Sequence, residues 1–286
     1  MSSHYETLQK ADAYREFFKV APPEELGERM LRARRPGFMI RAVRPGEAAS
    51  EPLATDGVPV AEAAVAQAPA TQAPTTQAFA SETPASETPA ADAPAAPAAR
   101  KVAAPVVREL VAAQWGLVPH WVKTASDARL RAIKLLHARN ETASTAQAFR
   151  DAWLNNQRCI IPIMAFFEDD HRSGKPVSTR ISRIDGKPMG LAGLWARWQG
   201  PDGEDILSFA ALNITANTHG LLHRYQPPGN ERRMPAILNE GAYDAWLSVR
   251  QDKAREFMRQ YAANWLTANP VENKKDKIPK DWRVAQ

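Results

Sequence analysis

A long stretch rich in alanine and proline, Glu51–Ala99, limits what this chain can fold into. It contains a single aromatic residue, Phe79, and no lysine or arginine, and the sequence Ser-Glu-Thr-Pro-Ala occurs twice in succession from Ser81. Such a segment cannot bury enough apolar surface to offset the entropy lost on ordering. We therefore expect a disordered, partly polyproline-like insertion, and a hydrophobic core built from the residues on either side of it.

The insertion also masks the charge of the remaining chain. It contains six of the 32 acidic residues and none of the 37 basic ones, which leaves 37 basic and 26 acidic residues elsewhere. The formal net charge of that remainder is +11, against +5 for the whole chain. A body this basic favours an anionic partner, with nucleic acid ahead of an acidic membrane surface.

Cysteine content and hydropathy exclude several classes of protein. The single cysteine, Cys159, cannot form an internal disulfide and suits a reducing compartment, and it lies in an apolar run where packing is its simplest role. The sequence shows no apolar run long enough to span a bilayer, no signal peptide, and no cysteine–histidine pattern with zinc spacing. We expect a cytoplasmic, monomeric protein, associated with the nucleoid when bound to DNA, with no membrane contact, metal or cofactor.

Apolar periodicity and turn residues predict an α+β fold. Helical spacing is found over residues 4–19, 125–136, 146–155, 243–247 and 254–261. Strands are expected over residues 37–41, 109–119, 159–167, 178–184, 191–198, 206–215 and 233–238. Gly200–Gly203 is a strong hairpin signal between two of them. Short turns between strands favour one domain, which the insertion interrupts.

One predicted strand places a carboxylate, Glu168, directly after two aromatic residues, where it must pair or act as an acid, a base or an anchor. It belongs to a series of seven short motifs, Gln114–Pro119, His137–Thr142, Phe149–Trp153, Arg158–Pro162, Phe166–Glu168, Gly190–Trp195 and Arg233–Leu238. In this order the motifs resemble the SOS response-associated peptidase (SRAP), or abasic-site-processing, family. The resemblance is strong over residues 108–250 and weak over residues 1–45.

The resemblance implies a single SRAP-like α+β domain with a mixed, largely antiparallel, curved β-sheet core and peripheral helices. We expect residues 1–49 to form its first part and residues 106–262 its main part. The insertion would occupy residues 50–105, and residues 263–286 would form a basic C-terminal tail.

The family resemblance also implies a reaction at the start of the chain. Removal of Met1 exposes residue 2, which is a cysteine in the family. Its α-amine and thiol condense with the aldehyde of an abasic deoxyribose and close to a thiazolidine, a lasting protein–DNA cross-link. The same nucleophile is associated with removal of a leading peptide. An asparagine, a glutamate and a histidine support the chemistry.

Three of these four positions differ in this chain. Residue 2 is Ser2, the asparagine position is His137, and the histidine position is Gln226, with His223 three residues earlier. The glutamate is present as Glu168. A hydroxyl is a weaker nucleophile than a thiol, so we expect at most a transient imine from the α-amine of residue 2.

Further residues are implicated in DNA binding. Arg139 and Arg233 would hold phosphates, and the segment with Trp115 and Pro119 resembles the family's DNA-contacting loop. A tryptophan there could stack on a base or pack in the core.

The candidate site residues also have purely structural interpretations, and other functions stay open at this point. His137 could be a surface histidine, and Glu168 could merely pair with an arginine. A relative that binds single-stranded DNA without chemistry fits the basic body equally well. A Ser–His–Glu hydrolase uses the same residue types, although the chain has no nucleophile-elbow sequence.

Overall fold

The computed structural model describes residues 4–43, 106–225 and 229–271. These residues belong to one compact unit, Met1–Ser50 together with Pro105–Gln286. The expected insertion over residues 50–105 and two predicted site residues, Ser2 and Gln226, lie outside the described residues.

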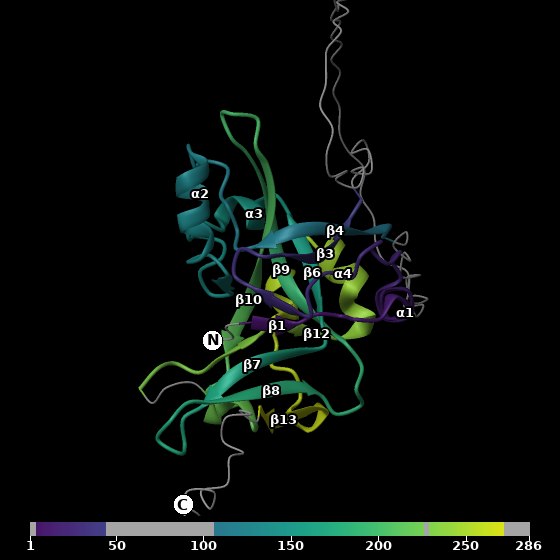
Figure 1. The fold of residues 1–286 in the computed structure, drawn as a ribbon, viewed down its shortest axis with the longest axis vertical. Helices are drawn as coiled ribbons and strands as arrows, with labels where there is room; N and C mark the ends of the chain where they lie inside the picture. Colours follow the sequence, from purple (N-terminus) through teal and green to yellow (C-terminus); the bar gives the residue numbers. More distant parts are fainter. Residues whose placement is uncertain (1–3, 44–105, 226–228, 272–286) are drawn as a thin grey trace, which may run out of the picture. The chain divides into compact units, whose positions relative to one another are not determined.

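Five strands of this unit close into a β-barrel (Figure 1). They follow the order β10–β4–β3–β6–β9, and β9 pairs again with β10. The β10–β4 pair is parallel, and the other pairs are antiparallel. The strands are β3 (Pro36–Ala42), β4 (Arg108–Trp115), β6 (Arg158–Ile163), β9 (Met189–Gln199) and β10 (Asp205–Thr215).

Three short strands add to the barrel. β5 (His137–Arg139) and β11 (Arg233–Pro235) pair with β10, while β12 (Ile237–Leu238) pairs with β9. Because β5 and β11 share β10 as a neighbour, motifs far apart in the chain meet at one part of the sheet. Arg139 lies opposite Asn213, and Arg233 lies opposite Thr215.

A second sheet of five antiparallel strands contains the first described residues. Its order is β13–β8–β7–β1–β2, so β1 lies inside the sheet with a partner on each side. Figure 1 shows β7, β8 and β13 below the barrel strands. The strands are β1 (His4–Glu6), β2 (Met30–Arg32), β7 (Ala165–Asp170), β8 (Val177–Arg183) and β13 (Leu266–Pro270).

The helices are short and lie around these sheets. α2 (Ala125–Ala132) begins at Thr124, whose hydroxyl accepts a hydrogen bond from the Asp127 N–H. The others are α1 (Ala11–Ala13), a π-helical turn (Tyr14–Phe18), α3 (Arg150–Leu154), α4 (Tyr243–Ser248), and 3₁₀ turns at Leu222–Arg224, Glu240–Ala242, Ala254–Phe257 and Ala263–Trp265. The observed architecture confirms the predicted α+β class.

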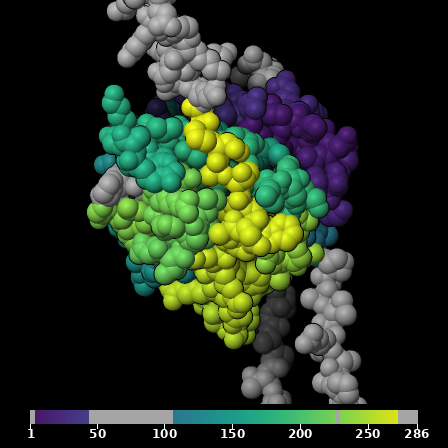
Figure 2. All heavy atoms as spheres, turned by 90° about the horizontal axis from the view of Figure 1, so that it is seen from below, coloured from purple at the N-terminus to yellow at the C-terminus, as the bar shows by residue number. Residues whose placement is uncertain are grey.

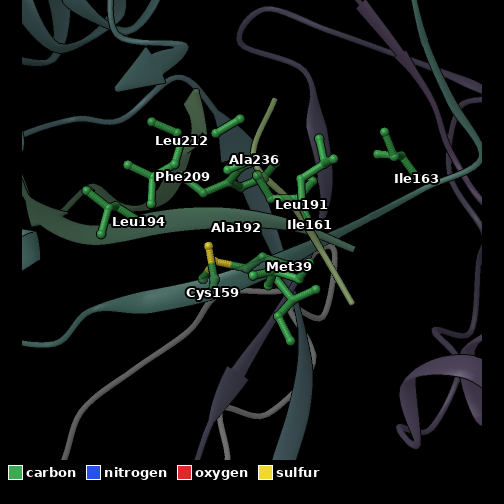
Figure 3. Close-up of a cluster of buried hydrophobic side chains, with 14 of the residues drawn as sticks. Met39, Cys159, Ile161, Ile163, Leu191, Ala192, Leu194, Phe209, Leu212 and Ala236 are labelled. Carbon is green, nitrogen blue, oxygen red and sulfur yellow. The ribbon is translucent and has the colours of Figure 1, made fainter. Parts of the chain in front are cut away.

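The main hydrophobic core joins both sheets. Trp115 and Phe209 from the barrel belong to the same buried cluster as Tyr5 and Phe166 from the second sheet. Figure 3 shows Cys159 within this cluster, beside aliphatic side chains of neighbouring strands. Burial raises the pKa of the Cys159 thiol well above its usual value, so the thiolate is not accessible. The packing role predicted for this cysteine is confirmed.

The glycine of the Gln114–Pro119 motif is required by its surroundings. Gly116 has a φ of +119°, and a Cβ atom there would lie 2.4 Å from the carbonyl oxygen of Ala132, at the end of α2. Only glycine fits this close approach of two backbone segments. The bend lets the chain leave β4 and pass beneath α2.

Several sequence predictions need correction. The strand expected over residues 159–167 is two strands, β6 and β7, which belong to different sheets, and the helix expected over residues 254–261 is only a 3₁₀ turn at Ala254–Phe257. Residues 4–19 were expected to form one helix, but the first three form β1 and only Ala11–Phe18 is helical, because Tyr5 is drawn into the core between two strands. Residues 263–286 were expected to be a tail, but Leu266–Pro270 forms β13 at the sheet edge, paired with β8. The last described residues, yellow in Figure 2, accordingly run across one face of the molecule.

Candidate functional site

The described chain starts against the strand that carries Glu168. In the β1–β7 pair, Tyr5 lies opposite Phe166 and Glu6 opposite Ala165. The imidazole ring of His4 stacks on Phe167, with 4.2 Å between ring centroids. β1 therefore fixes the first described residue next to the strand segment that ends in Glu168.

Tyr5 connects β1 to the barrel. Its side chain is fully buried, and its hydroxyl oxygen lies 3.0 Å from Nε2 of His137 in a hydrogen bond. Its ring also packs on Trp115, with 4.5 Å between centroids. Burial, with a smaller contribution from the negative charge of Glu168, raises the pKa of Tyr5 far above its usual value, so the phenol stays protonated. Sequence analysis did not identify Tyr5, because a lone tyrosine in a helical pattern carries no such signal.

His137 is neutral in this environment. Its ring lies edge-on to Trp115, at 5.5 Å between centroids, as well as against Tyr5. Burial of the ring lowers the pKa of His137 to about 3, because the charged imidazolium would lose its hydration. At neutral pH the residue therefore offers a hydrogen-bonding imidazole and no positive charge.

Glu168 is a buried carboxylate on the same sheet. Its exposed fraction is 5%, and on β7 it lies opposite Thr179 of β8. On β7 it follows Phe166, the cross-strand partner of Tyr5, by two residues, so Glu168 and Tyr5 lie on the same face of the sheet. Because Tyr5 is also hydrogen-bonded to His137, two of the predicted catalytic positions lie in one neighbourhood.

The two predicted phosphate ligands occupy different environments. The Arg233 side chain is only 3% exposed, and its guanidinium donates to Glu141, Glu231 and Asn213. Arg139 is 56% exposed, and its Nη1 lies 3.3 Å from Oε2 of Glu231. Arg139 is exposed enough to contact a ligand, whereas the buried Arg233 guanidinium is held by contacts within the protein. Sequence analysis did not identify Glu231, which contacts both arginines.

Trp115 is buried in the core, while Pro119 lines a cleft. Trp115 has no exposed surface, and its indole N–H donates to the carbonyl oxygen of Leu136 at 3.0 Å. Pro119 is buried at the edge of a polar cleft of about 220 Å³, next to His120 and Asp151. A ring without an exposed face cannot stack on a base, so Trp115 acts as a core residue. The structure favours that reading over base stacking.

The segment around His223 approaches β7 from the other end. Tyr225 is buried and forms an isolated β-bridge with Asp170, two residues after Glu168. His223 is exposed, and its Nδ1 is 2.7 Å from the carbonyl oxygen of His219. The chain leaves the described part directly after Tyr225, so Gln226 follows a residue that is anchored beside β7.

Comparison with known proteins identifies the family. The model of the SOS response associated peptidase (SRAP) family matches residues 58–277. The chain belongs to this family.

Curated relatives of the chain include abasic site processing proteins, two of which illustrate the similarity. The one from Gallus gallus, HMCES, is 24% identical over 173 residues, which cover 53% of this chain and 49% of the relative. The one from Saccharomyces cerevisiae is 28% identical over 154 residues, which cover 52% and 37%. This chain therefore spans about half the length of these relatives, or less.

Solved structures of similar proteins confirm the fold. A Bordetella bronchiseptica protein is 29% identical with a TM-score of 0.69, and the match covers 95% of this chain and 100% of that one. A Bacteroides thetaiotaomicron protein is 26% identical with a TM-score of 0.53, covering 58% and 70%. Both are structural genomics targets.

Metal-binding clusters and membrane-spanning helices are absent from the described ranges. Over residues 4–43, 106–225 and 229–271, His, Cys, Asp and Glu side chains do not gather in groups of three or more suited to a metal ion. In the same part of the chain, every helix is too short or too polar to cross a membrane.

The depressed pKa of His137 predicts an acid sensitivity. In the unfolded chain an imidazole has a pKa near 6.5, so the unfolded state binds a proton that the folded state excludes. The free energy of unfolding should then fall as the pH drops from about 6.5 towards about 3, by at most about 1.4 kcal/mol per pH unit. Urea unfolding at pH 4.5–7.5 should show a shallower decline for His137→Gln than for the parent protein. Exposed His223→Gln is the matched control, and equal slopes in all three proteins would contradict the assignment.

Proposed function

We propose that this protein engages abasic sites in single-stranded DNA through the α-amine of Ser2, after removal of Met1. The family and the names of its curated relatives support a role in processing abasic DNA damage. The observation that carries the proposal is the placement of β1. Chain connectivity keeps the Cα of residue 2 within about 7 Å of the His4 Cα. His4 itself stacks on Phe167 of β7, the strand that also carries Glu168.

The chemistry uses groups that the chain contains. The neutral amine attacks the aldehyde carbon of the ring-opened sugar to give a carbinolamine, and loss of water then gives an imine. Both steps move protons, and Glu168, a buried carboxylate on the strand next to β1, would carry them. The Ser2 hydroxyl can add to the imine to close an oxazolidine ring, but this product reopens readily, unlike a thiazolidine. The proposed adduct is therefore transient, and strand cleavage by β-elimination can follow from the imine.

DNA binding would rest on charge and on Arg139. The chain outside residues 51–99 has a formal net charge of +11. Arg139 is the more exposed of the two predicted phosphate ligands and lies two residues after His137 on β5. Side chains two apart on a strand share a face, so Arg139 projects on the same side as the His137 ring.

A second candidate is a family member that binds single-stranded DNA without reacting. The neutral His137, with its Nε2 already hydrogen-bonded to Tyr5, favours this reading, because it is a poor proton carrier at neutral pH. The serine at residue 2 favours it as well. The two candidates differ in one measurable step, the formation of an imine.

Borohydride trapping separates the candidates. Incubation with an abasic single-stranded oligonucleotide and sodium borohydride should give a covalent adduct, whose mass spectrum places the sugar on residue 2. The trapped fraction should rise between pH 6 and 8, because an α-amine with a pKa near 8 loses its proton over this range. Glu168→Gln should slow trapping on the order of 100-fold.

Asp169→Asn is the matched control, because Asp169 is the exposed carboxylate beside Glu168. It should trap like the parent protein. Intact DNA binding with no trapped adduct at any pH would establish the non-reacting binder instead, and equal rates for both variants would remove Glu168 from the mechanism.

A further inference from the structure

Glu231 contacts both of the arginines that the sequence predicted as phosphate ligands. Its Oε1 accepts a hydrogen bond from Nη1 of Arg233 at 2.7 Å, and its Oε2 lies 3.3 Å from Nη1 of Arg139. The Glu231 side chain is 37% exposed. A single carboxylate thus contacts a buried guanidinium with one oxygen and an exposed guanidinium with the other.

The two contacts differ in how easily they can be exchanged. Arg233 is also held by Asn213 and Glu141, so its position does not depend on Glu231 alone. The contact with Arg139 is longer, and both of its side chains reach solvent. Exposed ion pairs contribute little free energy and are easily replaced by other partners. The Arg139 contact is therefore the one that an incoming anion can displace.

A carboxylate and a phosphate present similar oxygens to a guanidinium. Glu231 consequently occupies, at Arg139, a position suited to a DNA phosphate. A phosphate that approaches Arg139 must displace this carboxylate and then remain beside its negative charge.

We propose that Glu231 is a competing carboxylate that limits the affinity of this interface for the DNA backbone. The inference rests on the proposed function, because it concerns the same binding face. By weakening phosphate binding at Arg139, Glu231 would make the affinity for DNA depend more on contacts other than those with the backbone phosphates. In this way it would set how strongly the protein discriminates a lesion from ordinary single strands.

Fluorescence anisotropy with two single-stranded oligonucleotides tests the proposal. One contains a tetrahydrofuran residue, an abasic-site analogue without the aldehyde, and the other is undamaged. Glu231→Gln should tighten binding of the undamaged strand about threefold to tenfold at low salt. The plot of log affinity against log salt concentration should steepen by about 0.7, as for one added phosphate contact on a single strand.

Glu240→Gln is the matched control. Glu240 is also a partly exposed glutamate paired with a buried arginine, Arg183, at 2.6 Å, so its replacement changes the net charge by the same amount. It should leave DNA binding unchanged. The double variant Glu231→Gln/Arg139→Gln should lose the gained affinity. Thermal melts of all variants report on folding, and the glutamine oxygen can still accept the Arg233 hydrogen bond.

Each other outcome overturns the proposal in a recognisable way. Equal gains for Glu231→Gln and Glu240→Gln would reduce the effect to net charge. Weaker binding by Glu231→Gln would show that Glu231 organises the arginines for DNA. Both results leave the proposed function standing. Absence of DNA binding by the parent protein and all variants would overturn the proposed function and this inference together.

Discussion

Ser2→Cys is expected to turn a transient adduct into a lasting cross-link with abasic single-stranded DNA. The cysteine thiolate adds to the imine and closes a five-membered thiazolidine, whereas the serine hydroxyl gives an oxazolidine that reopens. The adduct of Ser2→Cys should persist without borohydride on a denaturing gel, where the parent protein should leave none. A shift from undetectable to majority cross-linked protein is the expected size of the effect.

Two further variants define what the cysteine contributes. Ser2→Ala keeps the α-amine and should still be trapped by borohydride, because imine formation needs no side chain. Combining Ser2→Cys with Glu168→Gln should slow cross-linking while leaving its final product stable. A Ser2→Cys protein that binds abasic DNA and forms no cross-link would show that this scaffold no longer supports the reaction, which would establish the non-reacting binder.

Trp115→Ala is expected to destabilise the fold by about 3–5 kcal/mol. The ring is fully buried, packs on Tyr5, and donates to the Leu136 carbonyl oxygen, which keeps only the Ala211 N–H as a donor when the ring is removed. This loss is a large fraction of the stability of a typical domain. Urea unfolding should show it as a lower midpoint, and Trp265→Ala is the control, because Trp265 is 49% exposed.

A milder variant separates packing from DNA contact at this position. Trp115→Phe keeps an aromatic ring in the core and should fold. If Trp115 acts only as a core residue, the folded Trp115→Phe protein binds single-stranded DNA as tightly as the parent protein. A loss of affinity on the order of tenfold in a stably folded variant would restore the base-stacking role.

Much of the fold could be predicted from local patterns. Runs such as residues 191–198 and 206–215, separated by Gly200–Gly203, predicted the hairpin of β9 and β10, which is present. The buried role predicted for Cys159 is confirmed as well. These features follow from residue type and spacing, because each depends on neighbours close in the sequence.

Features that depend on distant partners could not be predicted. β13 contains Thr267, Asn269 and Pro270, a polar sequence that becomes a strand because the edge of β8 offers it a hydrogen-bonding partner. The barrel closes through a parallel pair, β10 with β4, which no local pattern specifies.

The candidate site likewise combines residues that could be predicted from local sequence with contacts that depend on distant partners. Glu168 stands out because a carboxylate inside an apolar strand is unusual, and the structure places it in a buried position. The Tyr5–His137 hydrogen bond joins residues 132 positions apart, so no spacing rule reveals it. Arg233 was identified as a phosphate ligand from its charge, whereas its burial and its partners depend on the packed fold.

The central position of β1 has a consequence for how damage would be found. A strand that is hydrogen-bonded on both sides cannot swing out, so His4–Glu6 keep a fixed place beside β7. On the proposed function, the DNA must supply the movement and bring its sugar to the N-terminal end of this strand. A flexible single strand can do this at small cost, while a duplex would first have to unstack and extrude the damaged nucleotide. The rigidity of the protein would itself select the form of DNA that it processes.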